Sequence, residues 1–306
     1  MKLSIVIPVY NGSQTIKELV GQIKNELIDL EYEVVLVNDC SPDNSEAVCS
    51  EIASEYSNVV FISLRKNSGE HNAVMCGLNH VSGDYTIIMD DDFQNPPSEI
   101  MKLYNEAKKG YDVVYSKYLK KKHSIYRNLG SKFTDKMAVL LIGKPKNLYL
   151  SSFKIINNDV VKELIKYKGP FPYIDGLILR VTNNITSVFV EHALRNQGQS
   201  NYSFSRLLSL YMNMFINFSI KPIRLMIFSG LGIFLIGIVM SLLFIIENYT
   251  HSNMPVGWTA IAILIITFSG FQILFLGLLG EYIGKQYLDQ NSTPQWTVKF
   301  VKRRKD

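Results

Sequence analysis

Two long uncharged apolar stretches in the last third of the chain limit what it can fold into. Neither Leu225–Ile246 nor Val256–Leu279 contains an Asp, Glu, Lys or Arg. Each stretch is long enough to cross a bilayer as an α-helix, and only a short segment separates them. A buried core helix is the alternative for either run, but two in succession favour a hairpin of two transmembrane helices within residues 223–284.

Basic residues flank this predicted hairpin on both sides. The connecting segment 247–255 has no Lys or Arg, whereas Arg224 precedes the first stretch and a basic tail, residues 285–306, follows the second. The positive-inside rule therefore predicts a multi-pass protein of the inner membrane with both termini in the cytoplasm. The formal net charge of +5 then indicates attraction to anionic lipid, and the sequence contains no nucleic-acid-binding motif. Residues 203–222 predict an amphipathic interfacial helix, or alternatively a helix packed on the preceding domain.

Residues 1–202 predict a cytoplasmic α/β domain. The β-branched runs "LSIVIPV", "EVVLVND", "VVFISL" and "YTIIMD" alternate with amphipathic segments at 14–30, 45–56 and 69–80. This alternation is typical of βαβ units in a Rossmann-like, mostly parallel sheet. Neither GxGxxG nor GxxxxGK[ST] occurs, so neither a dinucleotide fingerprint nor a P-loop is supported.

Three consecutive carboxylates follow the fourth predicted strand, in "IMDDDFQNPP" at 88–97. If strand geometry persists, Asp90 and Asp92 point to one side and Asp91 to the other. Two carboxylates on one side favour a divalent cation between them, and Mg²⁺ takes one or two carboxylates together with substrate phosphates. Gln94 shares their parity and offers a carbonyl ligand. An acidic turn that caps a helix beginning near Pro97 is the alternative, but a position past a strand end in an α/β sheet favours a ligand site.

Further candidate groups lie at the same edge of the sheet and downstream of it. Asp39, in "NDCSPD", ends the second predicted strand, where a carboxylate can bind a base or ribose; an Asx turn or helix N-cap is the alternative. In "YSKYLKKKHSIYRNLGSK", Arg127 and Ser131 share one face if the segment is helical, and both can donate to one phosphate. Asp175, in "PYIDG", is a candidate for binding sugar hydroxyls or for a turn.

Six motifs occur in order along the chain: "PVYNG", "NDCSPD", "LRKNSGEHNAVMCGL", "GDYTIIMDDDFQNPP", "RNQGQSNYSFSRL" and "GLLGEYIGKQY". This ordered set resembles the family 2 glycosyltransferases that load sugars onto polyprenyl phosphate, the group of dolichol-phosphate mannose synthase and the bacterial undecaprenyl-phosphate sugar transferases. The resemblance implies a GT-A fold and an inverting, metal-dependent transfer of a sugar from a nucleotide-sugar, here a UDP-sugar, to undecaprenyl phosphate for cell-envelope glycan modification. It implies Mg²⁺ or Mn²⁺ as cofactor.

The resemblance also implies roles for individual residues. It assigns catalysis to Asp92 and Arg127, and the metal to Asp90, Asp92 and Gln94. It assigns the lipid phosphate to Lys117, Arg127 and Ser131. The residues assigned to the nucleotide are Pro8, Tyr10, Asp39, Asp90, Asp91 and Arg195. An acceptor phosphate is already ionised at neutral pH, with a second pKa of about 6, so the reaction requires no general base.

The chain departs from the family pattern at three places. Gly12 stands where an acidic residue is usual after "PVYN", and Asn201 stands where a Lys often follows the Ser. The segment "LSSFK" at 150–154 replaces an Asp-Phe-Arg-like motif near the expected sugar site, so the sugar can differ.

Alternative functions are a transferase for another lipid or a growing polysaccharide, and a catalytically silent membrane scaffold. The sequence lacks the QxxRW motif usual in processive synthases, and a scaffold needs no metal site. Small residues in "SGLGIFLIG" permit close helix contacts, and with them a homo-oligomer.

Overall fold

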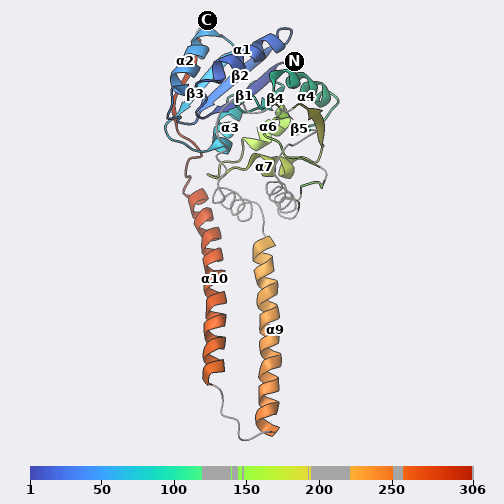
Figure 1. Cartoon of the computed structure of the whole chain (residues 1–306), viewed down its shortest axis with the longest axis vertical. Helices are drawn as coiled ribbons and strands as arrows, with labels where there is room; N and C mark the ends of the chain where they lie inside the picture. The colour runs from blue at the N-terminus through green and yellow to red at the C-terminus, as the bar shows by residue number, and fades with distance from the viewer. Residues whose placement is uncertain are drawn as a thin grey trace. The chain divides into compact units, whose positions relative to one another are not determined.

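The computed structural model describes residues 1–118, 139, 144–146, 148–191, 193, 221–250 and 258–304. The chain divides into two compact units: Met1–Ser203 together with Asn291–Asp306, and Phe204–Gln290 (Figure 1). The first unit contains a sheet with its helices. The second contains two long helices, α9 (Lys221–Thr250) and α10 (Trp258–Gln290).

The first unit is built on one eight-stranded sheet with the order β7-β5-β6-β4-β1-β2-β3-β8. β1 pairs in parallel with β2 and β4, β2 pairs in parallel with β3, and β5 with β7. β6 and β8 run antiparallel to their neighbours. The predicted mostly parallel α/β sheet is therefore confirmed. The strands are β1 (Leu3–Val9), β2 (Tyr32–Asn38), β3 (Val59–Leu64), β4 (Tyr85–Ile88), β5 (Val113–Tyr118), β6 (Lys154–Asn157), β7 (Ile185–Val190) and β8 (Val298–Arg303).

Helices pack against the predicted strands and against the strands that follow them in the chain. α3 packs against β1 and β2, α2 against β3, and α4 against β5 and β6. In β1, Ile5, Val6 and Ile7 are all fully buried, as expected of a strand whose two faces are both covered. The helices of this unit are α1 (Ile16–Glu26), α2 (Ser45–Glu55), α3 (Glu70–Leu78), the 3₁₀ turn η1 (Pro97–Glu99), α4 (Ile100–Ala107), α6 (Asn158–Leu164) and α7 (Ile174–Val181).

Residues 298–303, predicted to belong to a basic tail, form the strand β8. β8 pairs with β3, and the Phe300 ring meets the Phe61 ring edge-on at a centroid distance of 5.6 Å. Lys299 Nζ lies 2.8 Å from Glu46 Oε1 of α2. The basic residues expected to form a tail therefore belong in part to the edge of the sheet.

The two apolar stretches that predicted a transmembrane hairpin fall within α9 and α10, apart from residues 256 and 257, which precede α10. Within residues 221–250 and 258–304 and the rest of the described chain, no helix combines the length and the apolar character that crossing a membrane requires. Of the predicted interfacial helix, residues 203–220 lie outside the described residues.

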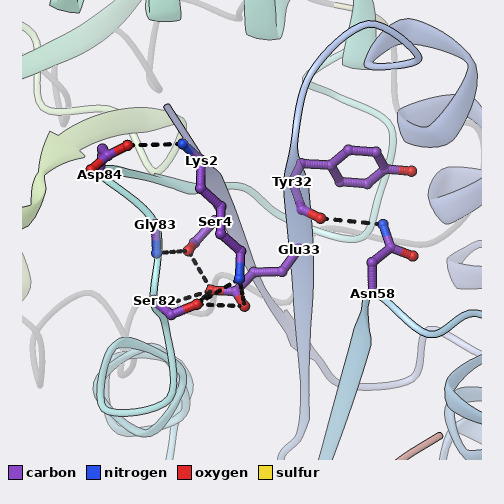
Figure 2. A network of polar contacts seen from close by, with 8 residues as sticks. All are labelled: Lys2, Ser4, Tyr32, Glu33, Asn58, Ser82, Gly83 and Asp84. Carbon is purple, nitrogen blue, oxygen red and sulfur yellow. Dashed lines mark hydrogen bonds and ion pairs between the residues drawn. The ribbon is translucent and has the colours of Figure 1, made fainter. Parts of the chain in front are cut away.

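A buried polar network centred on Glu33, called here the Glu33 network, joins the amino-terminal ends of β1 and β2 to the turn before β4 (Figure 2). Glu33 Oε1 accepts from Ser4 Oγ and Ser82 N, both at 2.6 Å, and Oε2 accepts from Lys2 Nζ at 2.9 Å. Burial by itself raises the pKa of Glu33, but the hydrogen bonds outweigh it and the pKa is lowered. Because these are the amino ends of the strands, the network has a structural role away from the carboxyl edge.

Candidate functional site

The strand order brings the predicted donor residues together at one edge of the sheet. β1 lies between β2 and β4 and is parallel to both, so the carboxyl ends of all three strands meet at one edge. Pro8 is the next-to-last residue of β1. The segments that leave this edge, called here the donor edge, contain Tyr10 after β1, Asp39 after β2, and Asp90 to Asp92 after β4. In open α/β sheets, ligands bind at this edge.

The backbone at the donor edge is unusual in each of the three segments. Asn11, Cys40 and Phe93 have φ angles of 60°, 53° and 61°, and each follows one of the three strands. Among the described non-glycine residues, only Ser292 also has a positive φ. Left-handed backbone at non-glycine residues costs energy and clusters at ligand sites, which supports the assignment of this edge.

Asp39 is almost fully buried, with 4% of its surface exposed. Its two carboxylate oxygens accept hydrogen bonds from Ser68 N at 2.7 Å and Gly69 N at 2.8 Å. Gly69 has φ 91°, a conformation that glycine adopts readily, and it is the N-cap of α3. Burial raises the pKa of Asp39 despite the two amides, which lower it. Asp39 therefore fixes the turn before α3, and its further lone pairs can still accept from a ligand.

The Asx turn expected in "NDCSPD" is made by Asp43 and not by Asp39. Asp43 Oδ1 accepts from Ser45 N, two residues further on, and from Ser45 Oγ. Asn38 Oδ1 accepts from Ser41 N at 3.3 Å. The local turn contacts therefore belong to Asn38 and Asp43, and the turn or N-cap alternative for Asp39 is wrong, because its oxygens accept from Ser68 N and Gly69 N.

The carboxylates of Asp90 and Asp91 point in different directions, as the strand alternation predicts. β4 ends at Ile88, and Asp90 Oδ2 accepts from Ser152 Oγ at 2.6 Å, beside β6. Asp91 points elsewhere: a Cβ built on Gly12 falls 2.2 Å from Asp91 Oδ2. Asp92 Oδ1 accepts from Gln94 N at 3.1 Å.

Crowding of negative charge perturbs these carboxylates. The pKa of Asp90 rises to about 7, through burial first and then repulsion by Glu70 and Asp92. The pKa of Asp91 also rises to about 7, through burial and then repulsion by Asp90 and Asp92. Asp91 Oδ2 is buried with no hydrogen-bond partner in the structure. A bound cation would offset the repulsion among these carboxylates.

The carboxylates fit a divalent metal only in company with other oxygen ligands. Within the described residues, no group of three or more His, Cys, Asp or Glu side chains is arranged to hold a metal ion. Hard divalent cations such as Mg²⁺ are often held by one or two carboxylates, with the remaining positions filled by phosphate oxygens and water. Asp90 and Asp92 can supply two such carboxylates, and the repulsion among Asp90, Asp91 and Asp92 favours a cation beside them.

A second polar layer contains Lys154 and Tyr115, which the sequence did not predict as site residues, together with Asp175. Lys154 of β6 is 3% exposed and forms an ion pair with Asp175, and Tyr115 Oη donates to the same carboxylate oxygen at 2.8 Å. Lys154 Nζ also lies 5.0 Å from the centroid of the Tyr115 ring. The signal was the single charged residue in "SFKII". Asp175, suggested for sugar hydroxyls or a turn, is thus engaged in a buried ion pair.

Residues predicted for the acceptor side are placed only in part. Lys117, on β5, has its Nζ 5.2 Å from the centroid of the Phe189 ring of β7. Arg127, Ser131 and Arg195 lie outside the described residues. The described residues therefore form the donor half of the predicted site.

Comparisons with known proteins agree with this fold. The family model described as "Glycosyl transferase family 2" matches residues 4–165, just over half of the chain. Solved structures of glucosyl-3-phosphoglycerate synthase from Mycobacterium tuberculosis are similar. One, in complex with Mn²⁺, UDP and phosphoglyceric acid, has a TM-score of 0.53 at 19% identity and covers 69% of this chain and 75% of that chain.

Another structure of that synthase, with Mn²⁺ and UDP-glucose, has a TM-score of 0.51 at 19% identity over 69% of this chain and 75% of that chain. A third, with Mn²⁺, UDP-glucose and glycerol 3-phosphate, has a TM-score of 0.50 at 18% identity, covering 69% and 76%. At these identities the structural likeness establishes the GT-A type of fold. With a family match that includes β1 to β6 and the whole donor edge, the chain belongs to glycosyl transferase family 2.

Proposed function

We propose that the protein transfers a sugar from a UDP-sugar to a polyprenyl phosphate, undecaprenyl phosphate in a bacterial membrane, with inversion at the anomeric carbon. The observation that carries the donor half of this proposal is the meeting of Tyr10, Asp39 and the three consecutive carboxylates at one edge of the sheet. Similar structures that hold UDP or UDP-glucose with Mn²⁺ support the choice of nucleotide and metal.

Asp90 and Asp92 would hold a Mg²⁺ or Mn²⁺ ion, which stabilises the negative charge of the departing diphosphate when bound. Asp39 would bind the nucleoside, because its carboxylate is fixed by two amides at the end of β2. The raised pKa values of Asp90 and Asp91 mean that their ionised forms are disfavoured. A bound cation would favour the ionised forms and lower these pKa values.

The lipid acceptor is proposed from the sequence and from the surface of the second unit. Two uncharged apolar runs fall in α9 and α10, and many large apolar side chains there are exposed. Exposed apolar surface of this extent indicates a non-aqueous neighbour or a protein partner. Along the sequence, the second unit lies between the two segments that form the first unit, so both segments would lie on one side of a membrane that α9 and α10 cross. Residues that illustrate this surface are Phe228, Leu231, Leu235, Ile265, Ile273 and Leu276.

The test uses the purified full-length protein in detergent with undecaprenyl phosphate, Mn²⁺ or Mg²⁺ and a panel of labelled UDP- and GDP-sugars. We expect label from one donor to enter the organic-extractable lipid. EDTA and Asp92→Asn should each abolish the transfer, and Asp159→Asn, at an exposed position on α6, is the matched control that should retain it.

The other outcomes separate the alternatives. Hydrolysis or tight binding of a donor without lipid labelling would show that the acceptor is wrong and would favour another lipid or a polysaccharide. If no donor binds, the enzyme assignment itself fails and the scaffold gains support.

A further inference from the structure

Gln295, in the tail that follows α10, is buried in the first unit and holds a distant segment. It is 7% exposed, and its Nε2 donates to Tyr167 O at 3.0 Å and to Gly169 O at 2.7 Å. A side-chain amide has two N–H donors, so both are used on this one stretch of backbone. Gln295 therefore ties the tail to residues 167–175, called here the clamp segment.

The clamp segment in turn lies against the first turn of α3. Asn72 Nδ2 is 3.5 Å from Pro170 O, and the rings of His71 and Tyr173 meet edge-on at a centroid distance of 5.3 Å. Burial lowers the pKa of His71 to about 4, so its ring is neutral at pH 7 and acts as a packing group. Two successive side chains of α3 thus contact the clamp segment.

That first turn also fixes Asp39. Asn72 Nδ2 donates to Ser68 O at 2.7 Å, while Ser68 N and Gly69 N donate to the two oxygens of Asp39. A continuous series of contacts therefore connects the tail, the clamp segment, the turn before α3 and the carboxylate at the donor edge. Removing the side-chain amide of Gln295 leaves the carbonyls of Tyr167 and Gly169 without this hydrogen-bond donor, and we expect the clamp segment to loosen.

We propose that Gln295 is a positioning residue for the donor site, which holds the clamp segment against α3 so that the turn at Ser68 and Gly69 keeps Asp39 in place. This inference rests on the proposed function. Because Gln295 follows the last residue of α10, Gln290, by only a few positions, it also makes the nucleotide site depend on the chain that returns from the two-helix unit.

The test compares two variants of the tail in the full-length protein, with UDP and Mn²⁺ as the probe in isothermal titration calorimetry. Gln295→Met keeps the length of the side chain and removes its donors, and we expect UDP affinity to fall about three- to tenfold. Lys302→Met is the matched control: Lys302 Nζ donates to Ser50 Oγ of α2 at 2.8 Å and has no part in the clamp contacts. Its affinity for UDP should stay within about twofold of the wild type.

Further readouts distinguish positioning from general stability. In turnover, Gln295→Met should raise KM for the donor sugar nucleotide and leave kcat unchanged. Gln295→Lys, which retains an N–H donor for the two carbonyls, should recover much of the affinity. Hydrogen exchange of the Ser68 and Gly69 amides should be faster in Gln295→Met and unchanged in Lys302→Met.

Each result decides the matter. If the wild type binds UDP and Gln295→Met shows the same UDP affinity and the same amide exchange as the wild type, the inference is overturned and the proposed function stands. Failure of the wild type to bind UDP overturns both. If Gln295→Met does not fold, exchange in the wild type decides: UDP should protect amides of residues 167–175, and no change in their protection overturns the inference.

Discussion

Replacing Gly12 by Ala is expected to destabilise the donor edge because Asp91 occupies the space that the new methyl group needs. The added Cβ would lie 2.2 Å from Asp91 Oδ2 and 3.0 Å from Val9 Cγ1. Contacts between such atoms are ordinarily at least about 3.4 Å, so either the carboxylate or the loop must move. Overpacking of this kind costs about 1–3 kcal/mol. For a domain of this size, that corresponds to a fall in Tm of roughly 3–9 °C.

The assay is thermal unfolding of the full-length protein in detergent without divalent metal. Gly12→Ala with Asp91→Ala in the same chain should recover most of the lost Tm, because the short Ala side chain vacates the space. Gly21→Ala is the matched control: Gly21 lies within α1 with nothing within 4 Å of its added Cβ, and the change should stabilise by up to about 1 kcal/mol. An unchanged Tm in Gly12→Ala, or no recovery in the double variant, would refute the steric argument.

Three further predictions concern the described unit. Glu33→Gln should lower Tm at pH 7. Because the pKa of Glu33 is lowered on folding, its ionised carboxylate stabilises the folded state above the unfolded pKa of about 4.3, and this stabilisation is lost as pH falls through the folded pKa. The Tm difference from wild type should therefore shrink in acid, and a difference that grows instead would contradict the linkage. Lys154→Met should cost about 3–5 kcal/mol by leaving Asp175 buried without its cation, and Lys154→Met with Asp175→Leu should restore much of it in a denaturation series. Asp39→Ala should reduce UDP affinity at least about tenfold by calorimetry, since it removes a charged acceptor and frees the turn before α3; wild-type affinity would exclude Asp39 from the nucleotide site.

Gly12 also explains one departure from the family pattern in physical terms. The sequence has Gly12 where an acidic residue is usual after "PVYN". The structure places the Asp91 carboxylate over Gly12, so a carboxylate still lies at this point of the donor edge, although it comes from the segment after β4 and not from the segment after β1. Positions 12 and 91 depend on each other because their side chains compete for the same space, and a linear motif does not show this dependence.

Local pattern was enough for the central strands and for the donor side of the site. β1 and β3 coincide with the runs "LSIVIPV" and "VVFISL", because buried parallel strands are short, apolar and bounded by polar turns. The same pattern placed Asp39 and the three carboxylates at strand ends, and parallel strands bring their carboxyl ends to one edge. The assignment of the chain to glycosyl transferase family 2 also followed from the order of these motifs.

Pairings between distant residues were decided by the tertiary structure. The alternating run "VKFVKR" of β8 became a strand only because β3 offers an open edge more than 200 positions earlier in the sequence. The sequence does not show that Lys154 and Asp175 pair, because only the folded arrangement of β6 and α7 buries them together. Gln295 carries no signal at all in the sequence, since a buried amide is recognised by the carbonyls it meets. Secondary structure reflects neighbours along the chain, and these contacts depend on which elements the folded sheet places side by side.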